Sequence, residues 1–216
     1  KYVARRETPL WIAENCTQCM DCISACPDTA LPNTAQEVAT VLSTAIDGYL
    51  SEPADRAAAQ AAAPTMEANL REKMTAHVQA KENDHAFKDL IAAEIKAVEG
   101  LSEAGAAQLS EVFDRIPFAY AKTAGVFNAI EKKSPGDGGL FSIFVSDLCK
   151  GCGECVVECG EHEALVMASE TEELNSDHVS GTNFLDLLPD TPQKYLGRFD
   201  ESDPLSSHLG ALRNHL

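Results

Sequence analysis

Apolar residues recur at helical spacing through most of the chain between residues 34 and 133. Thr34 and Glu37 have the spacing of a capping box, which predicts the start of the first helix. Proline and glycine then divide the stretch, because both end helices. The first expected helix carries Val38 to Leu50, the second runs from 54 to 63 and stops at Pro64, and the third carries Met66 to Val78. The fourth is capped by Asp84 and ends at Gly100, the fifth runs from Ser102 to just before Pro117, and a further short helix covers 125 to 132.

Short strands are expected outside this stretch, around two cysteine-containing segments. Residues 8–15 and 140–148 precede these segments and are rich in strand-forming residues. Residues 28–32 and 161–167 follow them, and each is expected to form one helical turn and a return strand. The surroundings are therefore an internal repeat, and two β-loop-α-β halves related by a pseudo-twofold axis predict an α+β fold.

The chain becomes polar and acidic after Met167. We expect a loop over 170–183, a short apolar patch over 183–189 that packs on something, and a short terminal helix after 203–209. Because the segment has no core of its own, residues 170–216 are expected to form an extended linker or tail toward another domain or subunit.

All eight cysteines lie in two motifs with the spacing C-x2-C-x2-C-x3-C. Three thiolates spaced by two residues can wrap one face of a cubane cluster, and the fourth, on a short helix, points toward the other cluster. The spacing therefore predicts two [4Fe–4S] clusters with crossed ligation. One cluster takes Cys16, Cys19, Cys22 and Cys159, and the other takes Cys149, Cys152, Cys155 and Cys26.

Other roles for these cysteines fit less well. Structural zinc uses separated C-x2-C pairs and does not require a third evenly spaced cysteine. Disulfides need an oxidising compartment, and nothing here signals export. Free buried thiols would not recur at identical spacing. Gly160 stands after the second motif where Pro27 follows the first, and we expect this divergence to leave Cys159 as a ligand.

The charge balance is acidic, with 34 Asp and Glu against 17 Lys and Arg and a net charge of −17. Such a chain repels phosphate backbones, so nucleic-acid binding is disfavoured, and the acidity either suits basic patches on redox partners or only keeps the protein soluble. No apolar run approaches the roughly 20 residues that span a bilayer. We expect a soluble, cytoplasmic chain without a membrane partner.

No catalytic set is visible in the sequence. There is no Ser/His/Asp set, P-loop or Rossmann fingerprint, and none of the six histidines has a ligand spacing that stands out. His162 follows the second motif and is expected to be a surface residue that could tune a cluster. Gly136-Asp137-Gly138 is expected to form a turn in a flexible return loop over 134–139 rather than a thiamine diphosphate motif.

The flanks of the cysteine motifs resemble one family. The segments are Pro9 to Ile12 before Asn15-Cys16, the motif from Cys16 to Pro27, Gly139 to Ile143 before Cys149, and Phe184 to Pro189. They are similar to the ferredoxin-like domain of pyruvate:ferredoxin oxidoreductase and related 2-oxoacid:ferredoxin oxidoreductases. The resemblance covers 1–33 and 134–216, and the helical stretch departs from the common form by its length.

The resemblance implies an electron relay without a substrate site in this chain. Electrons would come from a thiamine diphosphate site, with Mg and coenzyme A, in a partner domain or subunit, and would pass to external ferredoxin or flavodoxin. The alternative is a free-standing ferredoxin-like carrier that serves a hydrogenase or another dehydrogenase. A purely structural role for the clusters is disfavoured, because one cluster would suffice to hold the fold.

The fold expected overall is a two-cluster bacterial ferredoxin fold with a long all-helical insertion. The predicted division is 1–33 with 134–169 for the two-cluster ferredoxin domain, 34–133 for the insertion and 170–216 for the tail. The insertion is expected to be a helical bundle packed on the ferredoxin core. The alternative is a docking platform that covers a cluster or a partner surface.

Overall fold

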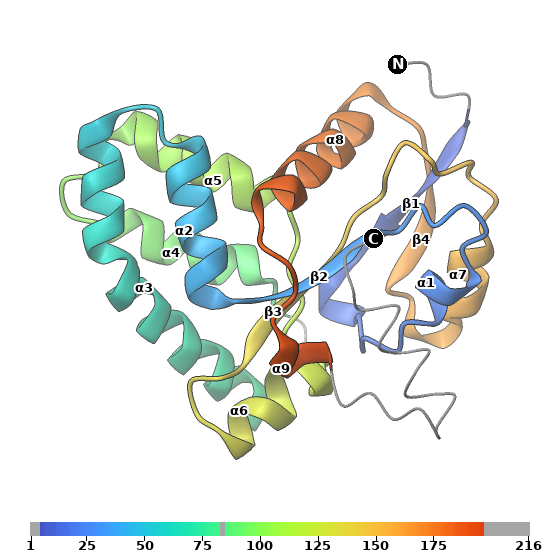
Figure 1. Ribbon diagram of the computed structural model, residues 1–216, viewed down its shortest axis with the longest axis horizontal. Helices are drawn as coiled ribbons and strands as arrows, with labels where there is room; N and C mark the ends of the chain where they lie inside the picture. Colours follow the sequence, from blue (N-terminus) through green and yellow to red (C-terminus); the bar gives the residue numbers. More distant parts are fainter. Residues whose placement is uncertain (1–4, 83–84, 197–216) are drawn as a thin grey trace.

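The computed structural model describes residues 5–82 and 85–196 of the chain. It combines helices with two small antiparallel sheets, which confirms the expected α+β class. Helices α2 to α5 lie at one end of the molecule, and the part that carries the cysteines lies at the other (Figure 1). The strands are β1 (Glu7–Trp11), β2 (Asn33–Glu37), β3 (Gly139–Ile143) and β4 (Leu165–Ser169).

The helices range from short turns beside the cysteines to one long helix at the far end of the molecule. Short 3₁₀ turns cover Ala13–Asn15 and Gly160–His162, and a π-helical segment covers Ala124–Asn128. Among the described residues, the α-helices are α1 (Asp21–Ala25), α2 (Val38–Tyr49), α3 (Pro53–Ala80), α4 (Phe87–Lys96), α5 (Glu103–Arg115), α6 (Ala129–Lys133), α7 (Glu154–Cys159), α8 (Glu172–Leu187) and α9 (Gln193–Leu196).

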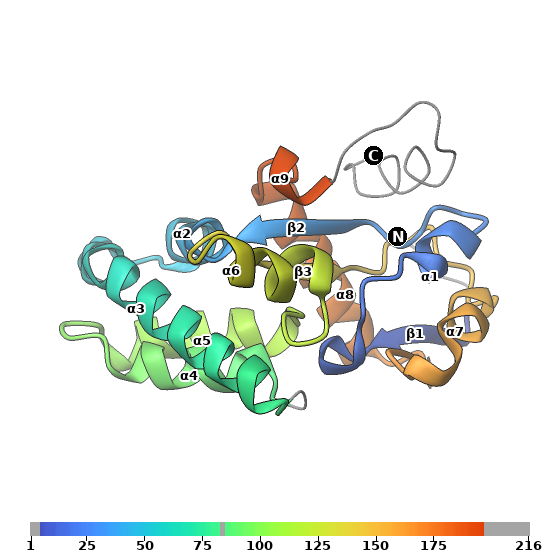
Figure 2. The same ribbon diagram turned by 90° about the horizontal axis from the view of Figure 1, so that it is seen from below.

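The strands pair across the two halves of the internal repeat. The first strand of the first half, β1, pairs antiparallel with the last strand of the second half, β4, so that Trp11 lies opposite Leu165. In the same way β2 pairs antiparallel with β3. The two sheets lie at different levels and do not form one continuous sheet (Figure 2). This exchange of strands places α1 against α7, the two short helices that follow the cysteine loops.

The return strand of the first half lies later in the chain than expected. It is β2, which includes both Thr34 and Glu37, so the predicted capping box is wrong. Thr34 is buried in the sheet, with its hydroxyl 3.1 Å from that of Thr191. Pairing with β3 along the whole length of β2 outweighs the local preference of these residues for a helix start. Helix α2 begins directly after it, at Val38.

Pro64 does not end a helix, so the two helices expected over 54–63 and 66–78 are wrong as separate elements. Residues 53–80 form one helix, α3, with Pro64 inside it. Proline removes one backbone hydrogen bond, but tertiary packing can maintain the helix across the gap. Met66, Leu70 and Met74 supply that packing, because all three are buried in the core beyond the proline.

The next two helices agree more closely with the sequence. Helix α5 starts beside Ser102 as expected, and the Ser102 hydroxyl caps it by accepting the N–H of Gly105 at 3.0 Å. Asp55 on α3 ties this cap to the bundle, because its carboxylate accepts the Ser102 hydroxyl at 2.6 Å. Helix α4 covers Phe87–Lys96 and stops short of Gly100, while the expected Asp84 cap lies outside the described residues. The short helix expected over 125–132 corresponds to the π-helical segment and α6.

Residues 170–183 do not form a loop, which makes that prediction wrong. Helix α8 covers Glu172–Leu187, and Thr171 caps it by accepting the N–H of Leu174 at 3.1 Å. Its buried positions are Gly181, Phe184 and Leu185. Phe184 and Leu185 belong to the core that α2 to α5 share, so the apolar patch expected over 183–189 packs on the helices. The terminal helix expected after 203–209 lies outside the described residues.

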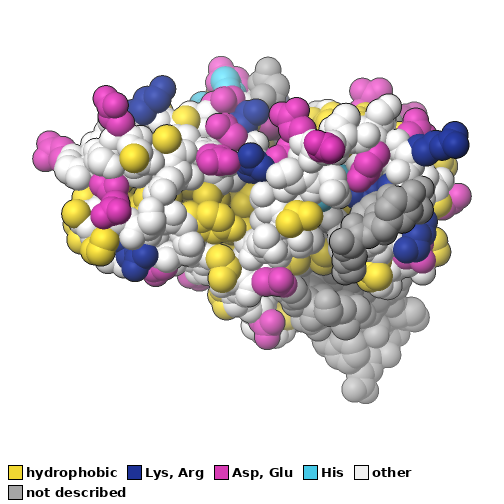
Figure 3. Space-filling view, turned by 90° about the horizontal axis from the view of Figure 1, so that it is seen from above, with side chains coloured by type: hydrophobic (Ala, Val, Ile, Leu, Met, Phe, Trp, Pro, Cys, Tyr) yellow, Lys and Arg dark blue, Asp and Glu magenta, His cyan; other side chains and the backbone are white. Residues whose placement is uncertain are grey.

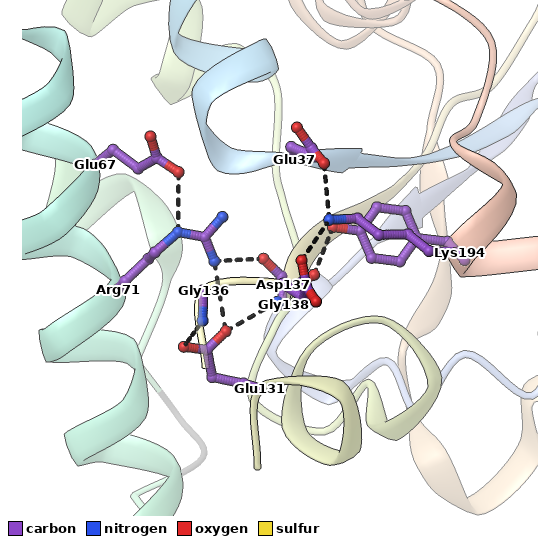
Figure 4. Close-up of polar contacts among 9 residues, drawn as sticks. Glu37, Glu67, Arg71, Glu131, Gly136, Asp137, Gly138 and Lys194 are labelled. Carbon is purple, nitrogen blue, oxygen red and sulfur yellow. Dashed lines mark hydrogen bonds and ion pairs between the residues drawn. The ribbon is translucent and has the colours of Figure 1, made fainter. Parts of the chain in front are cut away.

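The return loop over 134–138 is held by side chains from three helices (Figure 4). The Glu131 carboxylate accepts the N–H groups of Gly136 and Gly138 at 2.9 and 2.8 Å. Arg71 on α3 donates to the Gly138 carbonyl at 2.6 Å, and Lys194 on α9 is 3.3 Å from the Asp137 carboxylate. The loop that we expected to be flexible is thus tied on both sides, and Asp137 has a protein partner.

Buried side chains fall into two clusters. One joins α2 to α5 with α8 and includes Leu42, Phe113 and Phe184. The other surrounds the cysteines and includes Trp11 and Phe141, whose rings meet edge to face with centroids 6.1 Å apart. The division of the chain into three parts stays a prediction. Among the described residues, no helix is long and apolar enough to cross a membrane.

Candidate iron–sulfur centre

The two cysteine loops have the same pattern of backbone dihedral angles although their sequences differ. The second residue after the first cysteine has a positive φ in both loops, +62° at Gln18 and +70° at Gly151. The residue two positions further on repeats this, with +72° at Met20 and +83° at Gly153. Glutamine and methionine adopt this region at a cost of about 1–2 kcal/mol. The recurrence shows that the loop path, rather than glycine, sets the conformation, and such strain gathers at functional sites.

The first cavity among the cysteines brings together residues from both motifs. Its cysteines are Cys16, Cys19, Cys22 and Cys159. The first three lie on the loop between β1 and α1 and at the start of that helix, and Cys159 ends α7. Three of the four are buried and Cys19 is half-buried. The walls include Trp11 and Phe141 from the cysteine-side core, and His162 also lines this cavity.

The second cavity has the reciprocal composition. Its cysteines are Cys149, Cys152, Cys155 and Cys26. Three come from the loop after β3 and the start of α7, and Cys26 follows the last residue of α1. Cys155 alone of these four is buried, and Cys152 is exposed. The cysteines of this cavity are therefore more exposed to solvent than those of the first.

Burial and mutual proximity make the thiolate forms of these cysteines costly. The pKa of Cys16 is raised to about 11, mainly by burial and also by the neighbouring Cys19 and Cys159. Burial also raises the pKa of Cys155 to about 11, where Cys149 and Cys26 add to the effect. A cationic centre that binds thiolates removes this cost, because it supplies the missing positive charge. Soft thiolate donors select iron–sulfur clusters, zinc or copper(I).

Two buried hydrogen-bond donors line the first cavity. The indole N–H of Trp11 and the amide nitrogen of Gln18 are both buried and have no partner among the described residues. The indole also lowers the pKa of Cys16, as does the backbone N–H of Gln18. A buried donor without an acceptor costs about 1–3 kcal/mol, and the sulfurs of an iron–sulfur cluster accept such donors. The residues present therefore fit a cluster.

Backbone donors reach the cysteines of the second cavity as well. The N–H of Ala30 donates to the Cys26 sulfur at 3.3 Å. The backbone N–H of Val156 acts on Cys155 and lowers its pKa. Hydrogen bonds to the sulfurs are one of the means by which a protein sets the reduction potential of a cluster.

A buried arginine supports the second loop from behind, and no sequence pattern indicates this role. Arg5 donates to the backbone carbonyls of Ser146 and Cys149 at 3.3 and 3.4 Å. Its Nε lies 2.8 Å from the Glu170 carboxylate, and its side chain is 2% exposed. Burial, and then the Arg5 charge, lower the pKa of His178 to about 4. Arg5 thus fixes the start of the second loop against β1 and β4.

One face of the molecule carries acidic side chains at both of its ends. On the face seen in Figure 3, acidic side chains lie over both the helical end and the cysteine end. Among the described residues, Leu148, directly before the second motif, and Val157, within it, are exposed large apolar side chains, at 50% and 71%. In sequence they stand on either side of the loop that carries the exposed Cys152, so apolar side chains are exposed at both ends of this loop.

Comparison with known proteins agrees with this centre. One family matches, a 4Fe-4S binding domain, over residues 13–35 and 146–162. These two segments contain all eight cysteines and both loops. No curated protein and no solved structure matches the chain. The chain therefore contains an iron–sulfur, ferredoxin-like domain and is an iron–sulfur electron carrier.

Proposed function

We propose that the chain binds two [4Fe–4S] clusters through crossed ligand sets and relays single electrons between them. The observation that carries the proposal is the composition of the two cavities, each with three cysteines of one motif and the fourth of the other. When bound, each cluster takes up and releases one electron. The proposed ligands are Cys16, Cys19, Cys22 and Cys159 for the first cluster, and Cys149, Cys152, Cys155 and Cys26 for the second.

The two sites are close enough for their cysteines to affect one another. Cys155 of the second site is among the groups whose charge raises the pKa of Cys22 in the first. Helices α1 and α7, which carry these two residues, pack together. Neighbouring sites favour a relay over a structural role, because one cluster would be enough to hold the fold.

We further propose that electrons leave the protein at the second site. Cys152 is exposed there, whereas Cys16, Cys22 and Cys159 of the first site are buried. Leu148 and Val157 give this side an apolar contact surface that a partner can cover. Burial disfavours the more negative reduced state of a cluster, and hydrogen-bond donors favour it. Because the cysteines of the first site are more buried than those of the second, we expect the two clusters to differ in reduction potential.

We propose a 2-oxoacid:ferredoxin oxidoreductase of the pyruvate type as the enzyme that this relay serves. Support comes from the flanks of the motifs, above all Pro9 to Ile12 and Gly139 to Ile143. In this proposal thiamine diphosphate, Mg and coenzyme A bind to a partner domain or subunit, and the chain itself holds no substrate. External ferredoxin or flavodoxin accepts the electrons.

The test is anaerobic co-purification followed by an electron-transfer assay. If the proposal is right, the chain co-purifies with a thiamine-containing partner, and the complex reduces added ferredoxin when it is given pyruvate and coenzyme A. Purification without such a partner, together with direct reduction by a hydrogenase or another dehydrogenase, would replace it with the free-standing carrier. Replacing Val157 with Lys should slow reduction of ferredoxin without changing the iron content.

A further inference from the structure

The end of α3 carries a group of metal-binding side chains that is separate from the cysteines. His77 lies in the last turn of the helix, Glu82 follows the helix, and His85 lies just before α4. One ligand atom from each residue can be chosen so that all three lie within 4.8 Å of one another. His77 is half-buried, and the other two are exposed. The electron relay uses none of these residues.

The backbone holds Glu82 close to His77. Lys81 ends α3 with φ +60°, a left-handed conformation that glycine usually supplies at this position. In consequence the N–H of Glu82 donates to the His77 carbonyl at 3.0 Å, and the N–H of Lys81 donates to the Val78 carbonyl at 3.2 Å. The position of Glu82 beside the last turn is therefore set by main-chain bonds, not by a free loop.

Tyr120 orients the imidazole ring of His77. The Nδ1 atom lies 3.1 Å from the Tyr120 hydroxyl, which reaches it from the buried segment after α5. That hydrogen bond fixes the ring and leaves Nε2 for another partner. Histidines that bind metals commonly have their second nitrogen held in this way by a neighbouring group.

His85 completes the group from the far side of the connection. Its ring stacks on that of His77, with centroids 4.1 Å apart and an angle of 25° between the planes. Its Nε2 atom lies 3.6 Å from the Glu82 carboxylate. Because both side chains are exposed, they can turn about their side-chain bonds while His77 stays fixed.

We propose that His77, Glu82 and His85 form a binding site for a divalent transition-metal ion such as Zn²⁺. Two imidazoles and a carboxylate are a donor set that zinc uses with water as the fourth ligand. Zinc–nitrogen distances of about 2.0–2.1 Å place tetrahedral ligand atoms roughly 3.4 Å apart. Small rotations of the two exposed side chains bring the atoms from within 4.8 Å to that separation. The ion would join the end of α3 to the start of α4.

The test uses the protein with both clusters in place, so that zinc does not meet free cysteines. Anaerobic titration calorimetry with Zn²⁺ should show one saturable site per chain. His85→Ala and Glu82→Gln should each weaken zinc binding at least tenfold, whereas Glu72→Gln, an exposed change on the same helix, should leave it unchanged. Visible absorbance and far-UV circular dichroism confirm that clusters and fold are intact in every variant.

Tyr120→Phe tests whether the hydrogen bond that orients His77 contributes to metal binding. The change keeps the ring in the core and removes only the hydroxyl, so zinc affinity should fall by about tenfold or more. Zinc binding that is as tight in His85→Ala and Glu82→Gln as in the unaltered protein would overturn the proposal. The absence of saturable binding in the unaltered protein would overturn it equally.

Discussion

Replacing Gly151 with alanine tests how closely the second cysteine loop must approach β1. A Cβ at Gly151 would lie 2.3 Å from the Glu7 carbonyl oxygen, which is backbone and cannot turn away. Gly153 in the same loop has a similar φ, +83° against +70°, yet a Cβ there would meet nothing within 4 Å. Gly153→Ala is therefore a matched control, since it carries the conformational strain without the contact.

The expected difference follows from these two environments. A left-handed backbone costs a non-glycine residue about 1–2 kcal/mol, and both variants bear this cost. Only Gly151→Ala must also open a backbone contact from 2.3 Å to beyond 3.0 Å, and overpacking of this kind costs about 1–3 kcal/mol. For a chain of this size that corresponds to a melting midpoint roughly 2–12 °C below that of Gly153→Ala. Glu7 is paired with Ser169 in the sheet, so the loop must move instead.

The assay combines thermal melting with iron and sulfide analysis on anaerobically reconstituted protein. Movement of the loop displaces Cys149 and Cys152, which flank Gly151, so Gly151→Ala should lose iron from the second site. Gly153→Ala should keep the iron content of the unaltered protein. Equal midpoints and equal iron contents for the two variants would show that the close approach to β1 does not constrain the loop, and the reasoning would be refuted.

Three further predictions concern other parts of the centre. Trp11→Phe removes the indole donor at the first cavity and should lower the potential of the first cluster by about 60 mV, if that N–H contributes about 1.4 kcal/mol; a redox titration followed by EPR that shows no shift would reject this. Cys26→Ser and Cys152→Ser each remove a proposed ligand of the second cluster, so both variants should keep the spectrum of the first cluster. Cys159→Ser should keep the spectrum of the second cluster instead, and a match between the spectra of Cys152→Ser and Cys159→Ser would contradict crossed ligation. Burial lowers the pKa of His178 to about 4, so neutral His178 contributes stability that is present above its unfolded pKa of about 6.5 and is lost as pH falls toward 4. His178→Gln should therefore lose less stability between about pH 7 and pH 5 by circular dichroism, and parallel pH profiles for the two proteins would contradict this.

The cysteine chemistry could be predicted from the sequence because spacing encodes it directly. Three cysteines two residues apart fix a loop, and the fourth, three residues further on, falls on the helix that follows. The structure then brings Cys159 to the first motif and Cys26 to the second, in the reciprocal pattern that the spacing suggested. The ligand assignment itself remains a prediction until a cluster is observed.

Helix boundaries were less predictable where tertiary packing outweighed local signals. Pro64 has the strongest helix-ending signal in the bundle, yet α3 continues through it because Met66 and Leu70 are buried beyond it. The sequence does not indicate α8, because the buried stripe of this helix is short and starts at Gly181. A Cβ at Gly181 would lie 2.9 Å from the Phe144 ring, so the absence of a side chain there is part of the packing.

Residues that support the candidate site from a distance could not be predicted from the sequence. Arg5 lies far along the chain from Ser146 and Cys149, and only the pairing of β1 with β4 brings them together. Trp11 belongs to the segments that carry the family resemblance, but only the folded chain shows that its indole N–H is buried beside Cys16. Gln18 gives no sequence signal for its positive φ, since glycine holds the equivalent position in the second loop.

Two neighbouring clusters in one chain are the central claim, and EPR with iron and sulfide analysis tests it most directly. The sample is anaerobically purified protein, fully reduced with dithionite. We expect about eight iron and eight sulfide per chain and a spectrum broadened by coupling between two reduced clusters, because Cys22 and Cys155 lie at adjoining sites. Zinc with little iron, or about four iron with the simple spectrum of one isolated cluster, would contradict the claim.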